Sequence, residues 1–317
     1  MHICGWVSSC DMRNDVNFDF WTHRQNRYWA QLMHAISLHD QYTANDGIQS
    51  TPQGLVMYAH WDDNYGSASA PMLGHISATA ALIGRVLNAF FGGNISLPTN
   101  YPGIYNLLNG MLPDVTIKTG NTERSSHSAR LMQTAFHGFG HGSHFQRAGQ
   151  THWIDLTWAT LRSHPNDQYG GGYGCGDNPN DGNVAIGESW AEFIGTNHAL
   201  RLYPNGEKAS RWAGSIPPNT WGSAFITNRN ALERESWFFN DWIATGIYND
   251  LMDVVNADPF ENAWDRTGGL TIQQLYEPLG PNIDFFYEYE WEIINRYGLN
   301  VINVDDILVN NNAGGCL

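Results

Sequence analysis

The part of the sequence that decides the fold reads Phe136-His-Gly-Phe-Gly-His-Gly-Ser-His-Phe145. His137 and His141 are four residues apart, so on a helix their imidazole rings lie on the same face, one turn from each other. Two imidazoles at that spacing can bind one zinc ion at about 2.0–2.1 Å. The stretch therefore predicts a metal-binding helix that is capped at Ser125 or Ser126 and runs to about Arg147.

Three glycines lie within this expected helix: Gly138, Gly140 and Gly142. Each glycine inside a helix costs about 0.5–1 kcal/mol relative to alanine. Metal coordination, or the close approach of another segment, could compensate for that cost. The alternative interpretation of the three histidines is that they are polar residues lining a groove.

A second pair of polar residues at helical spacing lies in Gly187-Glu-Ser-Trp-Ala-Glu-Phe-Ile-Gly195. We expect a helix over about Val184–Leu200, with Glu188 and Glu192 on one of its faces. Apolar neighbours would bury this helix, and buried carboxylates without a partner are costly. Glu188 is therefore a candidate third metal ligand, and Glu192 can accept a hydrogen bond from the ring N–H of a ligating histidine. The alternative is a solvated face with two ordinary glutamates.

His-x-x-x-His followed by Glu-x-x-x-Glu resembles the active site of gluzincin-type zinc metallopeptidases. The longer stretches Thr134–Gly149 and Gly187–Gly195 are similar to secreted metallopeptidase-like proteins of Bacteroidetes-type bacteria, over about residues 50–200. The resemblance implies a zincin-like fold, a Zn²⁺ cofactor, and a peptide, protein or glycoprotein substrate that is hydrolysed by zinc-activated water.

Carried over position by position, the resemblance makes His137, His141 and Glu188 the zinc ligands. It makes Glu192 the carboxylate that supports a ligand. It also implies that Val115-Thr-Ile-Lys-Thr119 is an edge strand, which would pair with an extended peptide substrate.

Gly138 departs from the family pattern His-Glu-x-x-His, in which the glutamate is the general base. Loss of a general base typically lowers the rate by about 10²–10⁴. Three explanations remain open. The protein is a pseudoenzyme that binds zinc and a peptide or glycan without turnover, another residue is the base, or glycine has been introduced at this position.

His144 is the candidate for that other base and our predicted catalytic residue. It lies almost two turns from His137, about 10 Å along a straight helix, so a single ion does not easily reach both. We expect His144 to line the cleft or to contact the substrate. The other histidines discussed lack metal-like spacing: His60, His75, His127, His152, His164 and His198.

A calcium site is a further expectation in the stretch that begins Asp177-Asn-Pro-Asn-Asp181 and ends at Glu188. It has the first, sixth and last residues of an EF-hand loop, but Pro179 occupies a ligand position and cannot ligate through its side chain. A calcium site of another kind, on Asp177 or Asp181, is the interpretation that we retain.

Short strands before the central helices, and mainly helices after them, predict an α+β fold: zincin-like, with a small sheet, metal-site helices and a mainly helical C-terminal part. We expect the metal-binding part to span residues 1–200, and residues 201–317 to close the cleft. The expected elements not yet given are helices at Phe18–Asp40, Pro71–Asn88, Trp237–Val255, Thr271–Leu279 and Phe285–Tyr297, and strands at Leu55–Trp61 and Asp114–Thr119.

The composition indicates which classes of partner are excluded. The 31 acidic residues outnumber the 16 basic ones, a net charge of −15, which excludes nucleic acid as the default partner because binding phosphates needs a basic surface. No apolar stretch reaches the roughly 18–20 residues of a membrane span.

The surface is almost free of lysine, which favours a secreted or cell-surface protein. The start, MHICGWVSSC, lacks the features of a signal peptide, so we expect Met1 to follow a removed signal. The four cysteines allow three disulfide pairings: Cys4, Cys10, Cys175 and Cys316.

Overall fold

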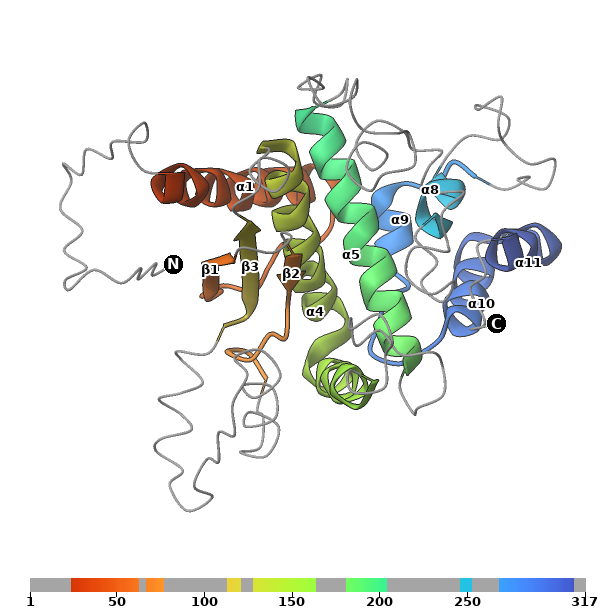
Figure 1. Cartoon of the computed structure of the whole chain (residues 1–317). Helices are drawn as coiled ribbons and strands as arrows, with labels where there is room; N and C mark the ends of the chain where they lie inside the picture. The colour runs from red at the N-terminus through yellow and green to blue at the C-terminus, as the bar shows by residue number, and fades with distance from the viewer. Residues whose placement is uncertain are drawn as a thin grey trace, which may run out of the picture.

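The computed structural model describes residues 24–62, 67–76, 113–120, 128–163, 181–203, 246–252 and 268–310. This part of the chain is mostly helical with one small sheet, so the fold is α+β at a coarse level (Figure 1). No helix in these ranges has the length and hydrophobicity needed to cross a membrane. The elements are α1 (Arg24–Asp46), β1 (Met57–Asp62), β2 (Ser67–Ser69), β3 (Val115–Gly120), α4 (Ser128–Ser163), α5 (Asp181–Leu202), α8 (Ile247–Met252), α9 (Ile272–Tyr276), α10 (Phe286–Tyr297) and α11 (Val301–Asn310).

The sheet has the strand order β1-β3-β2. β3 is parallel to β1, with Val115 opposite Met57, and antiparallel to β2, with Thr116 opposite Ser69. The prediction that Val115–Thr119 is an edge strand is therefore wrong, because β3 has a partner on each side. The alternation of Val115 and Ile117, both fully buried, identifies the face that packs on the core, but it carries no information about which edges are paired.

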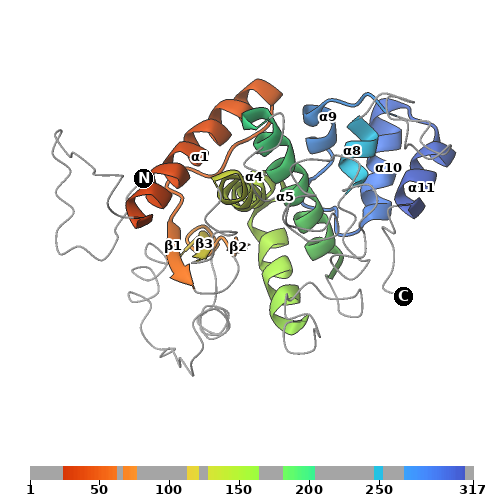
Figure 2. The ribbon, with the colours of Figure 1, turned by 45° about the horizontal axis from the view of Figure 1, so that its top comes forward.

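Helix α4 is longer than predicted and contains a kink. The helix expected to end near Arg147 continues to Ser163, but Gly149 within it has φ 84° and ψ 174°. A positive φ of this size suits glycine, which has no side chain to clash with the backbone. The residues after the kink therefore form a second helical segment that runs in a new direction (Figure 1, Figure 2).

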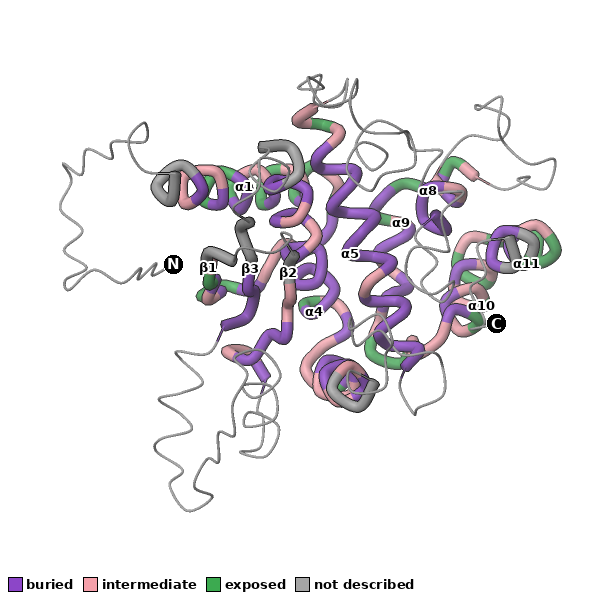
Figure 3. Tube along the Cα trace, viewed as in Figure 1, coloured by how far each residue is buried: buried purple, intermediate pink, exposed green. Residues whose placement is uncertain are grey.

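Helix α5 lies at the centre of the described structure, between α4 and the group formed by α8, α9, α10 and α11 (Figure 1, Figure 2). Nearly all of its residues are buried, on every side of the helix (Figure 3). One apolar core joins α1, the sheet and α4, and includes Leu32 and Phe136. A second core joins α5 to the C-terminal helices through Trp190 and Tyr248. Since α5 contributes residues to both cores, its position is set from two sides.

The other helices predicted from the sequence agree in part with those of the structure. The helix expected at Val184–Leu200 begins at Asp181 and is α5, and those expected at Thr271–Leu279 and Phe285–Tyr297 correspond to α9 and α10. Residues 71–76 form turns, not the start of a helix, and 77–88 lie outside the described residues. Of the helix expected at Trp237–Val255, the structure describes residues 246–252, which contain α8. All four cysteines lie outside the described residues.

A buried pair of histidines joins α1 to α5. Nδ1 of His39 lies 3.2 Å from Nδ1 of His198, and both side chains are fully buried. Nε2 of His198 lies 3.6 Å from a carboxylate oxygen of Asp46, which also binds Arg201. Burial lowers the pKa of both histidines, and the repulsion between the two rings lowers that of His39 further.

These pKa values predict a loss of stability in mild acid. The folded-state pKa of each histidine lies below the unfolded value of about 6.5. Its stabilising contribution is therefore complete above that pH and is lost as the pH falls towards the folded pKa, at up to about 1.4 kcal/mol per pH unit for each histidine. Urea unfolding at several values between pH 5 and 8 measures this slope. We expect His39→Asn to flatten it, and the control His34→Asn, on the exposed side of α1, to leave it unchanged.

Candidate metal centre

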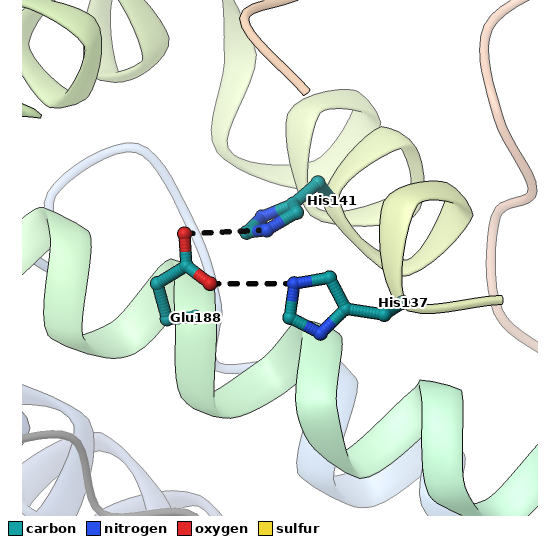
Figure 4. Close-up of side chains that lie close together, drawn as sticks. All are labelled: His137, His141 and Glu188. Atoms are coloured by element: carbon teal, nitrogen blue, oxygen red, sulfur yellow. Dashed lines mark ion pairs between the residues drawn. The ribbon is translucent and has the colours of Figure 1, made fainter. Parts of the chain in front are cut away.

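His137 and His141 lie one turn apart on the first segment of α4 and point towards α5 (Figure 4). Their ring centroids are 4.9 Å apart and the ring planes are nearly perpendicular, at 84°. The four-residue spacing thus places both Nε2 atoms over the same side of the helix, as the helical period requires. His141 is buried and His137 is partly exposed, so the pair lies at the border of the core.

Glu188 of α5 faces both histidines (Figure 4). One carboxylate oxygen lies 3.3 Å from Nε2 of His137 and the other 3.5 Å from Nε2 of His141. One ligand atom from each of the three side chains lies within 4.8 Å of the others, and in the described ranges no other histidine, cysteine or acidic residues form such a group. The structure therefore brings together the three residues that were predicted as metal ligands.

Close packing of α4 on α5 makes this meeting possible. A Cβ atom on Gly140 would lie 3.0 Å from Cα of Ala191, and one on Gly195 would lie 3.0 Å from Cβ of His137. Contacts this short force the neighbouring atoms to move. Gly140 and Gly195 thus allow α4 and α5 to pack closely. This packing brings the carboxylate of Glu188 next to the imidazoles of His137 and His141. This close approach is one of the two compensations that we expected for the glycines of α4.

Glu192 supports the cluster from behind His137. One of its carboxylate oxygens lies 3.1 Å from Nδ1 of His137. The other accepts hydrogen bonds from the amide of Gln133 at 3.3 Å and the hydroxyl of Thr196 at 3.4 Å. A carboxylate on Nδ1 orients the ring and, once the ring is neutral, keeps its proton on Nδ1, so that the lone pair is on Nε2. The position matches the role predicted for Glu192.

Gln133 and Thr196 were not singled out by the sequence reasoning. Both donate a hydrogen bond to Glu192. Gln133 lies one turn before His137 on α4, and Thr196 lies one turn after Glu192 on α5. The same four-residue spacing that identified the histidines could therefore have identified both residues. Polar side chains at such positions are common on helices, however, so the spacing alone is a weak signal.

The charges of the cluster are strongly coupled. Burial alone lowers the pKa of His137, but Glu188 and Glu192 outweigh it and raise that pKa to about 10. Burial would raise the pKa of Glu188, but His141 and His137 hold it well below its usual range. At neutral pH, without a metal, His137 is therefore protonated between two carboxylates, and a cation that binds there takes the place of a proton.

The donor set fits zinc. Two imidazole nitrogens and a carboxylate oxygen are ligands that zinc commonly takes in proteins. Ligand atoms about 2.0–2.1 Å from one tetrahedral ion lie roughly 3.3–3.4 Å from each other. The two Nε2 atoms lie 3.3 and 3.5 Å from different oxygens of Glu188, and one ligand atom from each of the three residues lies within 4.8 Å of the others, so the side chains would move closer together around a tetrahedral ion.

His144 does not join the cluster. Its side chain is fully buried, and its ring lies against Trp153 and His152, with centroid distances of 5.4 and 5.1 Å. A ring with no exposed surface does not contact a substrate in this conformation. The arrangement therefore gives no support to the catalytic role predicted for His144.

The calcium expectations have separate outcomes. The EF-hand alternative is wrong. The last eight positions of the expected loop, Asp181–Glu188, are helical, so they cannot form the loop that such a site needs. Asp181 is buried in the first turn of α5, where a carboxylate interacts favourably with the helix dipole. Asp177 lies outside the described residues, so a calcium site that includes it stays a prediction.

Comparisons with protein-family models, with curated proteins and with solved structures found no match to this chain.

Gly140→Ala tests the packing of α4 on α5. The added methyl group would press on the backbone of Ala191. Overpacking of this kind costs about 1–3 kcal/mol, more than the 0.5–1 kcal/mol that alanine contributes to a helix. We expect a lower free energy of unfolding and weaker zinc binding, measured by urea unfolding and calorimetric titration. The control is Gly280→Ala, whose added methyl group would lie 3.8 Å from its nearest neighbour. Equal stability and zinc affinity in wild type and Gly140→Ala would contradict the argument.

Proposed function

We propose that this protein is a zinc-binding, metallopeptidase-like protein with a zincin-like arrangement of its metal-site helices. The observation that carries the proposal is the convergence of His137, His141 and Glu188 from two helices, with Glu192 behind His137. These are the residue types and the helical spacings that zinc hydrolases use.

Each residue of the cluster has a definite part in this proposal. His137 and His141 would bind zinc through Nε2, and Glu188 through its carboxylate, which stays ionised between the two rings. Glu192 would keep the proton of His137 on Nδ1. A zinc ion held there would polarise a substrate carbonyl and lower the pKa of a water molecule.

Gly138 limits the chemistry that we propose. It is buried on α4 between the two histidines, and it has no side chain that could accept a proton. The buried ring of His144 does not replace the missing base. We therefore propose slow hydrolysis of peptide, protein or glycoprotein substrates, below that of an enzyme with the base by about 10²–10⁴.

A second candidate function follows from the same glycine. Without a general base, the zinc centre would bind a peptide or glycan without turning it over. This binding protein shares the metal site with the enzyme and differs from it only in catalysis. Export to the cell surface or beyond, expected from the composition, remains part of either proposal.

Metal analysis tests the zinc centre. We expect the double variant His137→Ala/His141→Ala to bind one zinc equivalent fewer than the wild type, because both imidazole ligands are removed. Glu192→Gln is expected to weaken zinc binding by about 10–100-fold, since it perturbs the group that orients His137. Elemental analysis after dialysis gives the stoichiometry. His34→Ala, on the exposed side of α1, is the control, and an unchanged zinc content in the double variant would reject the site.

Restoring a carboxylate at position 138 separates the two functions. If only the general base is missing, Gly138→Glu should raise the rate of hydrolysis of casein or a peptide library by about 10²-fold or more. Gly138→Gln is the matched control, because it has nearly the same size without a proton acceptor. An increase in Gly138→Glu alone supports the enzyme. No increase, with wild-type binding to a glycoprotein array intact, favours the binding protein.

A further inference from the structure

His144 and His152 form a second pair of neighbouring imidazoles on α4, on either side of the kink at Gly149. Their ring centroids are 5.1 Å apart and the rings are tilted by 69°, close to the 4.9 Å and 84° of His137 and His141. The kink is what brings the pair together, since residues eight positions apart lie more than two turns apart on a straight helix, about 12 Å along its axis.

The ring nitrogens of this pair have no hydrogen-bond partner among the residues that the structure describes. His144 and His152 are 0% and 2% exposed, all four of their ring nitrogens lack a hydrogen bond, and the carboxylate of Asp284 lies beyond hydrogen-bond length, at 3.5 Å from Nδ1 of His152. A buried polar group that is left unsatisfied costs about 1–3 kcal/mol. Such groups are rare in native proteins, and bound water or an ion is a common reason for them.

The surroundings hold the two rings in place. Trp153 packs edge-on against His144 at a centroid distance of 5.4 Å. A Cβ atom on Gly187 of α5 would lie 3.6 Å from Nδ1 of His144, so this ring rests against the backbone of α5. The pair is therefore enclosed by both segments of α4 and by α5.

A carboxylate, that of Asp284, lies near this pair, as Glu192 lies beside His137 in the first cluster. One carboxylate oxygen of Asp284 lies 3.5 Å from Nδ1 of His152, the same ring nitrogen that Glu192 binds in His137, although that hydrogen bond is shorter, at 3.1 Å. In the orientation that satisfies its amide, Asn183 donates to the same oxygen at 3.0 Å. The side chain of Asp284 is 43% exposed, so it marks the side on which the pair is closest to solvent.

Both imidazoles are neutral at physiological pH. Burial lowers the pKa of His152 to about 4, and burial followed by repulsion from His152 and His141 lowers that of His144. A neutral imidazole has one nitrogen with a free lone pair, and that nitrogen is the metal-binding atom. A cation bound here would therefore displace no proton from the two rings.

We propose that His144 and His152 bind a second divalent transition-metal ion, with Asp284 as the positioning residue that orients His152. Imidazole nitrogens favour zinc and its neighbours, cobalt, nickel and copper, over calcium and magnesium. Two protein ligands leave the other coordination positions to water molecules. We expect this site to bind more weakly than the cluster of His137, His141 and Glu188, which has one more protein ligand. The proposal does not depend on the function of that cluster.

Titration of the full chain with Co²⁺, followed by calorimetry and by elemental analysis after dialysis, tests the proposal. The wild type should bind two equivalents, and His144→Gln/His152→Gln one equivalent. Asp284→Asn should retain both equivalents and bind the weaker one about 10–100-fold less tightly. The control is His39→Asn/His198→Asn, which alters another buried histidine pair whose rings bind each other. This variant should retain two equivalents.

The outcomes separate this proposal from the zinc centre. One equivalent in the wild type and none in His137→Ala/His141→Ala would overturn the second site and leave the zinc centre standing. One equivalent in the wild type that persists in His137→Ala/His141→Ala would reject the zinc centre and support the second site. The wild type and His137→Ala/His141→Ala therefore test the second site even if His144→Gln/His152→Gln does not fold. Unchanged binding of both equivalents in Asp284→Asn would overturn the role of Asp284.

Discussion

The close approach of α4 and α5 is the constraint on which the candidate metal centre depends. Histidine and glutamate side chains from the two helices reach one another because the backbones lie close together. Gly140 and Gly195, each opposite backbone or Cβ atoms of the other helix, allow that contact. The apolar cores on both sides of α5 then hold it against α4. Close packing thus compensates for the helix propensity that is lost at Gly140.

The same contact explains why so many ionisable groups are tolerated inside the protein. A buried carboxylate without a partner is unstable, and so is a buried imidazolium. In the cluster, His137 stands between Glu188 and Glu192, and the second oxygen of Glu192 is bound by two neutral donors. Each charge therefore has an opposite charge or a hydrogen-bond donor beside it, which is the condition for burying it.

The sequence was sufficient to predict those parts of the candidate site that depend only on the geometry of a single helix. The four-residue spacings of His137 with His141, and of Glu188 with Glu192, place each pair on one helix face whatever the rest of the fold does. Their neighbours predicted the two helices within a few residues, apart from the segment that follows Gly149. The sequence also indicated that the glycines of α4 needed compensation, although it could not identify Ala191 as the neighbour of Gly140.

The sequence was insufficient where distant segments meet. The pairing of β3 on both sides depends on how the connections between strands run, and an alternating pattern reports only the buried face. His152 lacks metal-like spacing in the sequence, and the kink at Gly149 is what brings its ring next to that of His144. Asp284 is more than a hundred residues from either histidine, and nothing in its neighbourhood singles it out.

Burial of α5 on every side has a consequence for how this protein can change in evolution. A surface helix can exchange residues on its exposed face while its inner face is preserved. α5 has almost no such face, because α4 touches one side and the C-terminal helices touch another. Nearly every substitution in it must suit two neighbours at once. The helix that carries Glu188 and Glu192 therefore tolerates few substitutions, and changes around the candidate metal centre are easier in the segments that surround it.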